Sequence, residues 1–590
     1  MFEKVLVANR GEIAIRVMRT LKEMGIVSVG VYSEADRDAP HVGEADEAHL
    51  LGPPVPAESY LNIEKLLEVA QSAGAEAIHP GYGFLAENAD FAKACEKADV
   101  VFIGPPASAI EAMGSKTRAR ELMSEAGVPI VPGTTSPAES VAQAKKQAKE
   151  IGYPVACKAA GGGGGKGFRV AQSEDKLEEA FEGASREGDK FFSDPRVYLE
   201  RYLEDPRHVE VQVLADSHGN VIHLGERDCS IQRRHQKLIE EAPAPHVDEE
   251  MRERIGKIAT DAAAAVGYRS AGTVEGLQDG EEYFFLEMNT RVQVEHCVTE
   301  MVTGIDIVRE QVLIASGEKL SISQEDVELR GHAIECRINA EAAHKNFAPA
   351  PGKITSYIEP AGPGVRVDSG VLAGSEITPL YDPMVAKLIV WDTDRERATA
   401  RMLRALGEYE IGGVTTLIPF HEQILATDQW RNAGTARDLI GDRKWLKSLE
   451  PKAPAPAEAN GEREAEEALA RTYKVEVDGR LHSVKVIGAA APAAGNPGPA
   501  AVMRRPPRRE RTAGAAASGG TDVLVSPIQG TVLKVPVSQG DEVEEGALIA
   551  VVEAMKMENE ITAHRGGTVA ELSVTEGGSV AAGDTIARIE

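Results

Sequence analysis

The chain has 590 residues, of which 42% are hydrophobic and 27% are charged, and its formal net charge is −28 at pH 7. This length exceeds what one hydrophobic core supports, so several domains are expected, and the acidic balance argues against a general nucleic-acid binder. The five cysteines lack CxxC spacing, which favours reduced thiols over a zinc site or disulfides. No apolar run is long enough for a membrane span and no signal peptide is evident, so we expect a cytoplasmic protein.

Residues 1–114 are predicted to form an N-terminal α/β domain with a parallel, Rossmann-like sheet. Short apolar runs at 4–8, 27–32, 77–80 and 100–103 alternate with helical patterns, for example at 60–72. The loops that follow the first and third strands should lie at the ligand-binding edge of such a sheet. They lack the spaced glycines of a dinucleotide fingerprint, so NAD binding is not expected.

A glycine-rich loop marks the next domain, which we place at residues 115–330. Five consecutive glycines, 161–165, precede Lys166 and lie between predicted strands at 155–159 and 168–170. Their backbone N–H groups can face phosphate oxygens without obstruction by side chains. No Ser or Thr follows Lys166, which excludes a Walker A loop. The position between two strands favours a phosphate-binding hairpin over a flexible linker, as in ATP-grasp enzymes with a mobile lid, here about 133–203.

Polar chemistry concentrates in the second half of this domain. Glu275 and Glu287 lie on two predicted neighbouring strands, and Asn289 ends the second one. Two carboxylates and an amide suit Mg²⁺ bound with nucleotide phosphates. Because side chains alternate along extended backbone, Asn289, Arg291, Gln293 and Glu295 should share one side. That side would offer a metal ligand, an anion-binding guanidinium and a carboxylate base.

A further mixed domain at 331–446 is followed by a change of composition. Residues 447–520 are largely rich in Ala, Pro and Gly and are predicted to be a flexible linker, with a hairpin at 472–487 around Asp478-Gly479. A lone hairpin is marginal in water, so this one is a candidate docking element. The arginine cluster at 504–511 is assigned no function.

The C-terminal residues, 521–590, contain an internal repeat. Gly530-Thr531-Val532 recurs as 567–569, and further Gly, Val and Ile pairs are likewise separated by 37 residues. Two copies of a strand–turn–strand pattern predict a small barrel or sandwich with internal two-fold symmetry. Lys556 falls at the junction between the copies, within Ala554-Met-Lys-Met557. A solvated surface lysine is the ordinary interpretation, but the repeat and this motif favour a site of covalent attachment.

These motifs resemble the biotin carboxylase family. Residues 1–446 carry the runs Glu226–Lys237, Phe285–His296 and Glu335–Glu341, and residues 523–590 resemble a biotin carboxyl carrier domain, whereas lipoyl domains usually lack the two methionines. The whole layout resembles the α subunits of actinobacterial acetyl/propionyl-CoA carboxylases. The resemblance implies an α/β multidomain chain: a pre-ATP-grasp Rossmann-like domain, an ATP-grasp domain, a mixed C-terminal domain and an all-β barrel-sandwich biotinyl domain.

The resemblance also implies residue roles. ATP would contact Lys116, Lys158, His208, Gln232, His235, Glu275 and Glu287, with Glu200, Arg201 and Leu203 at the adenine and Gly164 and Gly165 over the phosphates. Mg²⁺ or Mn²⁺ would bind Glu275, Glu287 and Asn289, and bicarbonate would bind Lys237, Arg291, Gln293, Val294 and Glu295. Of the catalytic set Glu295, Arg291, Arg337 and Lys237, Glu295 would be the base and Arg337 would bind biotin and stabilise its enolate. Lys556 would be the biotinylated residue.

The resemblance implies a carboxylase whose biotin moves between two active sites. The roughly 30 flexible residues between Gly488 and Thr521 would give the carrier an r.m.s. reach of roughly 30 Å. A carboxyltransferase β subunit would be a separate partner in a hetero-oligomer, since no such domain fits after residue 446, and a biotin protein ligase would attach the biotin. A short-chain acyl-CoA, for fatty acid biosynthesis, is the expected acceptor, with a 2-oxo acid or urea as alternatives. A carrier with a decayed ligase domain is disfavoured because Glu275, Glu287, Glu295 and Arg337 are all present.

Overall fold

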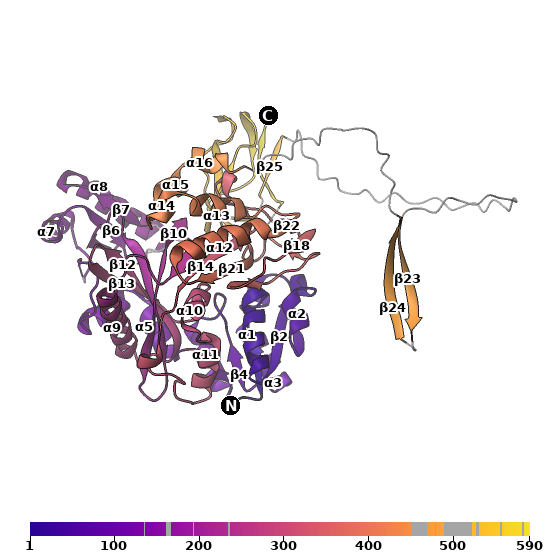
Figure 1. The fold of residues 1–590 in the computed structure, drawn as a ribbon. Coiled ribbons are helices and arrows are strands. Elements are labelled where there is room, and N and C mark those ends of the chain that lie inside the picture. Colours follow the sequence, from indigo (N-terminus) through magenta and orange to yellow (C-terminus); the bar gives the residue numbers. More distant parts are fainter. Residues whose placement is uncertain are drawn as a thin grey trace. The chain divides into compact units, whose positions relative to one another are not determined.

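The protein is described from a computed structural model. The residues it describes are 1–134, 136–160, 167–192, 194–233, 236–450, 469–477, 480–488, 522–526, 530–554, 557–580 and 583–590. Contacts divide the chain into two units, residues 1–450 with 522–590, and residues 451–521. The predicted fold class, α/β domains followed by an all-β domain, is confirmed (Figure 1).

The N-terminal region forms a five-stranded parallel sheet in the Rossmann-like order β3-β2-β1-β4-β5. Its strands are β1 (Lys4–Val7), β2 (Val27–Ser33), β3 (Glu47–Gly52), β4 (Ala77–His79) and β5 (Val101–Phe102). Helices α1 (Gly11–Glu23), α3 (Ile63–Ala73) and α4 (Ala89–Lys97) connect them. The loops after β1 and β4 meet where expected, since Asn9 Nδ2 donates to the carbonyls of Pro80 and Tyr82, each at 2.7 Å.

An eight-stranded sheet of mainly antiparallel strands carries most of the predicted site. Its order is β13-β12-β9-β10-β11-β14-β21-β19. The bounds are β9 (Arg207–Ala215), β10 (Val221–Arg233), β11 (Gln236–Ala242), β12 (Ser270–Asp279), β13 (Glu282–Asn289), β14 (His332–Asn339), β19 (Val365–Ser369) and β21 (Met384–Asp392). Strands β14, β19 and β21 come from beyond residue 330, so the two predicted domains on either side of that point share one continuous sheet.

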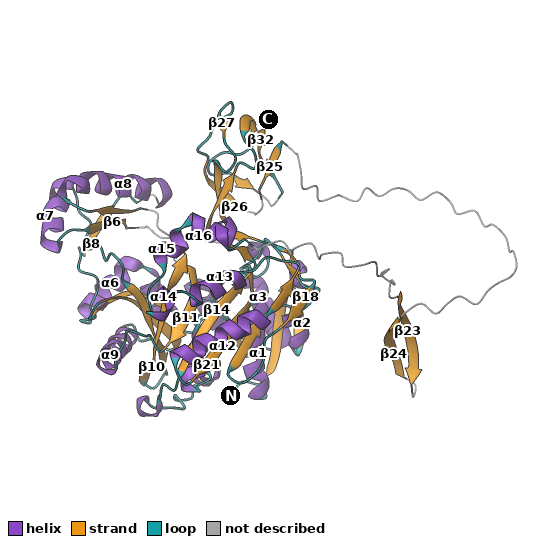
Figure 2. Cartoon of the chain, turned by 45° about the horizontal axis from the view of Figure 1, so that its top comes forward, coloured by secondary structure: helices purple, strands orange, loops and turns teal. Residues whose placement is uncertain are grey.

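Helices cover this sheet and seal its cores. Helix α9 (Glu249–Ala265) packs on β9 and β10, while α10 (His296–Thr303) contacts β10, β11, β14 and β21. Helix α12 (Arg395–Glu408) lies against β14 and β21 (Figure 2). Along β9, Val209, Val211 and Val213 enter an apolar core while the alternate residues Glu210 and Gln212 are fully buried on the other face. That buried polar face is where the candidate site begins.

A separate three-stranded sheet, β7-β6-β8, corresponds to the predicted lid. Strands β6 (Val155–Ala159), β7 (Phe168–Ala171) and β8 (Val197–Arg201) pack under α7 (Val141–Ile151) and α8 (Glu174–Phe192), which Figure 2 shows side by side. The glycine-rich loop, 161–166, lies outside the described residues.

The C-terminal region confirms the predicted repeat in its strand positions. The first half has β26 (Gly530–Lys534), β27 (Glu542–Val543) and β28 (Leu548–Ala554), and the second has β30 (Gly567–Leu572), β31 (Ser579–Val580) and β32 (Thr585–Ile589). Two four-stranded sheets result, β25-β32-β30-β27 and β29-β28-β26-β31, with β25 (Val523–Val525) and β29 (Met557–Thr562) at their edges. Each half therefore lends a strand to the other half's sheet. Ala554 pairs with Met557, and Lys556 in the connection between them lies outside the described residues.

In the second unit, the predicted hairpin is confirmed and is longer than expected. Strands β23 (Leu469–Val477) and β24 (Arg480–Gly488) pair antiparallel, and Val477 opposite Arg480 is the pair nearest the turn. The predicted turn residues, Asp478-Gly479, and the flanking linker segments lie outside the described residues.

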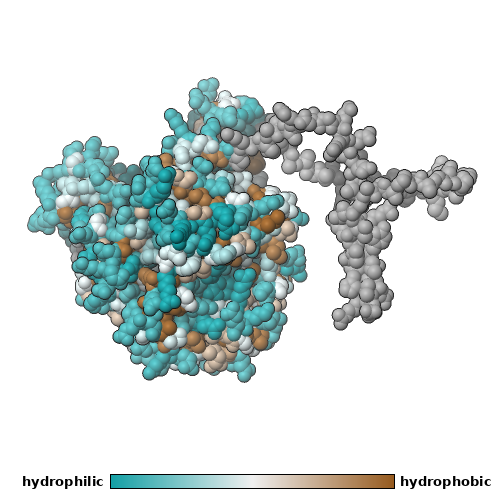
Figure 3. Space-filling view, in the orientation of Figure 1, coloured by the Kyte–Doolittle hydropathy of each residue, from teal (hydrophilic) through white to brown (hydrophobic). Residues whose placement is uncertain are grey.

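The face shown in Figure 3 is mainly hydrophilic, with smaller hydrophobic areas between the hydrophilic ones. Within the part of the chain that the structure describes, none of the helices combines the length and the apolar character needed to cross a membrane.

Candidate active site

A buried lysine on β11 is the centre of the polar cluster. Lys237 Nζ donates to three carboxylates, those of Glu210, Glu275 (2.7 Å) and Glu295 (2.6 Å). Burial alone would lower the pKa of Lys237, but the charges of these three glutamates raise it well above its usual range. The ammonium is therefore charged at neutral pH and can bind an anion.

Glu295 lies between two cations. Its second oxygen, Oε2, accepts a hydrogen bond of 2.9 Å from Nη2 of Arg337, and the residue is only 2% exposed. Burial would raise the pKa of Glu295, but Lys237, Arg337 and Arg227 hold it well below its usual range. Glu295 is thus ionised, which is the form that can accept a proton.

The two predicted metal-binding carboxylates face each other on adjacent strands. Glu275 on β12 is directly opposite Glu287 on β13, and Asn289 ends the same strand. Like charges placed opposite each other on a sheet repel, so this pair fits a hard divalent cation that takes oxygen ligands. In this structure Asn289 Nδ2 donates to Glu275 Oε1 at 2.8 Å, and His208 Nε2 lies 3.0 Å from Glu275 Oε2.

The segment after β13 brings its predicted side chains together through a loop. Gln293 Nε2 donates to Glu275 Oε1 at 2.8 Å, and Glu295 reaches Glu275 through Lys237. Arg291 Nη2 donates to Asn289 Oδ1 at 3.1 Å, while its Nε pairs with Glu87 at 2.9 Å. The carbonyl of Val294 accepts from Lys387 Nζ at 3.0 Å. Asn289, Arg291, Gln293 and Glu295 therefore join one hydrogen-bonded network, although residues 290–295 form a loop and not a strand.

The residues predicted to hold ATP fall into two groups. Lys158 on β6 and Glu200 on β8 form an ion pair, and Glu200 Oε1 also lies 2.7 Å from Arg120 Nη1. Arg201 pairs with Glu282, and Leu203 is buried beside Val131 and Phe284.

The remaining predicted ATP-binding residues either lie near Lys237 or fall outside the described residues. Gln232 Nε2 donates to the carbonyl of Cys229 at 2.6 Å, and His208 belongs to the Glu275 cluster. Lys116 is the first residue of α6 (Lys116–Glu125). Gly164, Gly165 and His235 lie outside the described residues.

Arg227 supports this cluster and was missed by sequence reasoning. Arg227 on β10 is fully buried, and its guanidinium donates hydrogen bonds to five side chains. These are Glu210 (2.7 Å), Gln212 (2.8 Å), Thr273 (3.1 Å), Gln293 (2.7 Å) and Thr299 (3.0 Å). Arg227 thereby fixes the amide of Gln293 and one oxygen of Glu210. The signal was the alternation along β9, whose polar positions face this cluster and not solvent.

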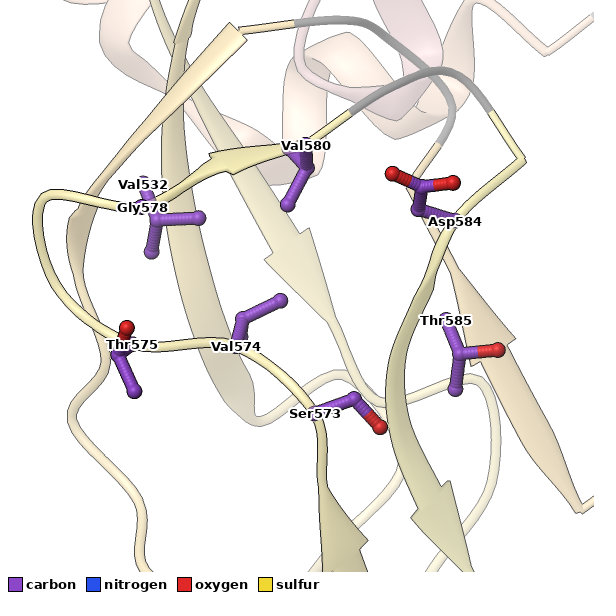
Figure 4. Close-up of a pocket in the computed structure, with 8 residues that line it drawn as sticks. All are labelled: Val532, Ser573, Val574, Thr575, Gly578, Val580, Asp584 and Thr585. Atoms are coloured by element: carbon purple, nitrogen blue, oxygen red, sulfur yellow. The ribbon is translucent and has the colours of Figure 1, made fainter.

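A cavity of about 300 Å³ lies elsewhere, in the C-terminal domain (Figure 4). Val532, Val574 and Val580 line it together with hydroxyl groups and the carboxylate of Asp584. No lysine, arginine or histidine is among its described lining residues. Its described lining residues therefore offer no cation to an anionic substrate, and the cluster around Lys237 remains the candidate active site.

Comparison with known families assigns most of the chain up to residue 442 and again from residue 522. Residues 1–110 match the biotin carboxylase N-terminal domain, 115–323 the ATP-binding domain of the carbamoyl-phosphate synthase L chain, 335–442 the biotin carboxylase C-terminal domain and 522–589 the family of biotin-requiring enzymes.

Individual relatives divide into full-length and partial matches. The alpha3 subunit of a biotin-dependent acyl-coenzyme A carboxylase from Mycobacterium leprae is 46% identical, over 100% of this chain and 98% of its own. One of the subunits of pyruvate carboxylase from Methanothermobacter thermautotrophicus is 57% identical, over 73% of this chain and 88% of its own. Among solved structures, a biotin carboxylase complex from Campylobacter jejuni has a TM-score of 0.70 at 49% identity, covering 74% of this chain and 98% of its own.

Proposed function

Since the chain belongs to the biotin carboxylase family, we propose that it uses ATP and bicarbonate to carboxylate biotin carried by its own C-terminal domain. It is an ATP-grasp enzyme, and its cofactors are biotin, ATP and Mg²⁺. The observation that supports this proposal best is the shared hydrogen bonding of Glu295 by Lys237 and Arg337. A buried base between two cations suits a reaction in which one anion, bicarbonate, is deprotonated and attacks the γ-phosphate of a second anion, ATP.

We assign nucleotide and metal binding to the cluster of acids and its neighbours. Glu275, Glu287 and Asn289 would hold Mg²⁺ (or Mn²⁺), which supplies positive charge against the phosphoryl group during its transfer. The ion pair of Lys158 with Glu200 is already formed on the small sheet. There the lysine would meet phosphate oxygens and Glu200 the adenine.

Bicarbonate would bind to Lys237, Arg291, Gln293 and the backbone of Val294. When bicarbonate accepts hydrogen bonds from Lys237, the ammonium stabilises the Glu295 carboxylate less. The pKa of Glu295 then rises, and the carboxylate becomes a better base. Glu295 then removes the bicarbonate proton as an oxygen of bicarbonate attacks the γ-phosphorus and the bond to ADP breaks.

The resulting carboxyphosphate would split into CO₂ and phosphate. The phosphate would take the ureido N–H proton of biotin, and that nitrogen would form its new bond to the carbon of CO₂. Arg337, held by Glu240 Oε1 at 2.6 Å, would face the ureido oxygen and stabilise negative charge on it. Each proton thus has a named acceptor within this chain or its substrates.

We further propose that the carboxyl group goes to a short-chain acyl-CoA on a separate carboxyltransferase β subunit, in a hetero-oligomer. The support is that the Mycobacterium leprae relative covers the whole chain, whereas the relatives named for pyruvate or 2-oxoglutarate match about three quarters of it. A 2-oxo acid or urea is the alternative acceptor. Biotin would be attached to Lys556 by a biotin protein ligase in the cytoplasm, where the five free cysteines stay reduced.

Radiolabelled bicarbonate tests the proposal on the full chain. With ATP and Mg²⁺, the biotinylated protein should acquire label that streptavidin captures, and removing ATP should abolish it. Lys556→Arg should lose the protein-bound label and streptavidin detection but still carboxylate free biotin. Label retained on Lys556→Arg would refute the attachment site, and no labelling of free biotin by either protein would refute the carboxylase.

A further inference from the structure

Two acids lie side by side behind Arg337. Glu240 on β11 and Glu335 on β14 are directly opposite in the antiparallel register, and both are 0% exposed. Residues paired in this way point to the same face, with Cβ atoms about 5 Å apart. Their carboxyl groups are therefore neighbours in a site closed to solvent.

The hydrogen bonding of this pair is incomplete. Glu240 Oε1 accepts from Arg337 Nε at 2.6 Å, but Glu240 Oε2 and both oxygens of Glu335 have no hydrogen-bond partner within the described part of the chain. A buried polar atom without a partner costs about 1–3 kcal/mol. A proton on Glu335 that is donated to Glu240 would satisfy one oxygen of each residue.

Apart from Arg337, the cations near this pair bind to other groups. Lys387 is paired with Arg337 across the strands and lies on the same face of the sheet. Its Nζ contacts the carbonyl of Val294 (3.0 Å), Cys297 Sγ (3.2 Å) and Glu12 (3.3 Å). The ionisable groups that act on the pair are Arg337 and Cys336 on β14, Lys387 on β21, Lys237 on β11, Cys229 on β10 and Glu295 before α10. Only Arg337 among them hydrogen-bonds to the pair.

Electrostatics agree with this geometry. Burial raises the pKa of Glu335 well above its usual range, and the neighbouring charge of Glu240 raises it further, against the opposing charge of Lys387. Burial likewise raises the pKa of Glu240, to about 7, although Arg337 opposes the rise. Both carboxylates cannot be ionised together without a large cost in this environment.

We propose that Glu240 and Glu335 share one proton at neutral pH and act together as positioning residues for Arg337. This inference rests on the proposed function of Arg337. With the proton in place, Arg337 faces the charges of Glu240 and Glu295 only, and a third negative charge is kept away from the pocket that receives bicarbonate. Glu240 also fixes the guanidinium through Nε, which leaves its Nη atoms directed towards Glu295 and the substrate.

The first test is spectroscopic and needs no turnover. Infrared spectra of the full-length wild type at neutral pH should show the C=O stretch of a protonated carboxylic acid above the amide I band, and Glu335→Gln should lose it. Glu341→Gln, another buried acid whose pKa burial raises, serves as the control and should keep the Glu335 band. A Glu335→Gln spectrum that keeps every such band would overturn the shared proton.

The second test is the pH profile of bicarbonate-dependent ATP cleavage with free biotin, from about pH 6 to about pH 9. Glutamine at 335 donates the same hydrogen bond but cannot ionise, so any alkaline loss of rate caused by the pair should move upward by about one pH unit or more. Glu335→Ala, which cannot donate, should instead lower the rate about 10- to 100-fold at every pH through misplacement of Arg337. Equal profiles for wild type and Glu335→Gln would refute the proposal.

The two tests separate this inference from the proposed function. If the wild type fails to cleave ATP with bicarbonate, the function fails but the infrared band still decides the shared proton. If Glu335→Gln does not fold, judged by near-ultraviolet circular dichroism, an infrared pH titration of the wild type decides the matter. A protonated band absent at neutral pH contradicts the proposal.

Discussion

Nζ of Lys237 lies 2.6 Å from Oε1 of Glu295, with both groups nearly closed to solvent. This hydrogen bond joins the proposed anion-binding group directly to the proposed base. The same lysine donates to Glu275, so one ammonium links the proposed metal-binding and bicarbonate-binding parts of the site.

Replacing the base should stop chemistry while leaving nucleotide binding intact. We expect Glu295→Gln to reduce bicarbonate-dependent ATP cleavage about 10²- to 10⁴-fold, which is the usual contribution of a positioned general base. Glu310→Gln is a matched control, because Glu310 is a buried acid that hydrogen-bonds to Ser321, outside the cluster. Near-normal turnover of Glu295→Gln would exclude it as the base.

Arg227 should matter first for stability. Arg227→Met leaves Oε1 of the buried Glu210 without its ion-pair partner, while Lys237 still contacts Oε2, and breaking a buried pair costs about 3–5 kcal/mol. Arg397→Met, at a side chain that is 68% exposed, should change the free energy of unfolding by less than about 0.5 kcal/mol. Chemical denaturation of the two variants makes the comparison, and similar midpoints would contradict the role given to Arg227.

Acid should destabilise the N-terminal domain through His79. Its Nδ1 accepts from the N–H of Gly81 at 3.0 Å, so the buried ring must be neutral, and burial lowers its pKa from 6.5 to about 4. Between these values the unfolded state binds more protons, so stability falls as pH falls, by about 3 kcal/mol in total.

Thermal melting of the wild type and His79→Asn measures this contribution. The asparagine can accept the Gly81 hydrogen bond but does not titrate in this range. Its melting temperature should therefore depend less on pH between about 4 and about 6.5 than that of the wild type. Parallel curves for the two proteins would remove His79 as the source.

The hairpin should contribute to partner binding. Deleting residues 472–487 removes most of β23 and β24, whose only described pairing is with each other. We expect weaker co-purification of the carboxyltransferase, whereas a deletion of equal length inside 489–518 should leave it unchanged. If both deletions behave alike, the hairpin is only a spacer.

Local signals predicted the fold well because they were strong at particular residues. Strand β6 occupies the predicted residues, and the 37-residue repeat reappears as equally spaced strands, with Gly530 and Gly567 opening matching ones. The joining of β11 to β14 was not predictable in this way, since pairing between strands nearly a hundred residues apart leaves no periodic trace in either one.

The sequence predicts those site residues whose type alone indicates their chemistry. It misses residues whose role depends on being buried. The sequence identifies Glu275 and Glu287 as acids on two neighbouring strands, and Glu295 as part of the alternating polar stretch that follows them. Arg227 and Glu240 look like ordinary charged residues in the sequence, and only the packed sheet reveals that water cannot reach them. The residues that Arg227 and Glu240 contact lie on other strands, so no local sequence pattern predicts these contacts.

The exchange of strands between the two halves of the C-terminal domain has a consequence for biosynthesis. Strand β25, at its start, pairs with β32, at its end, and β26 pairs with β31. During translation the domain cannot close until β32 has left the ribosome. A ligase that requires the closed domain can therefore add its group only after every strand from β25 to β32 has been synthesised.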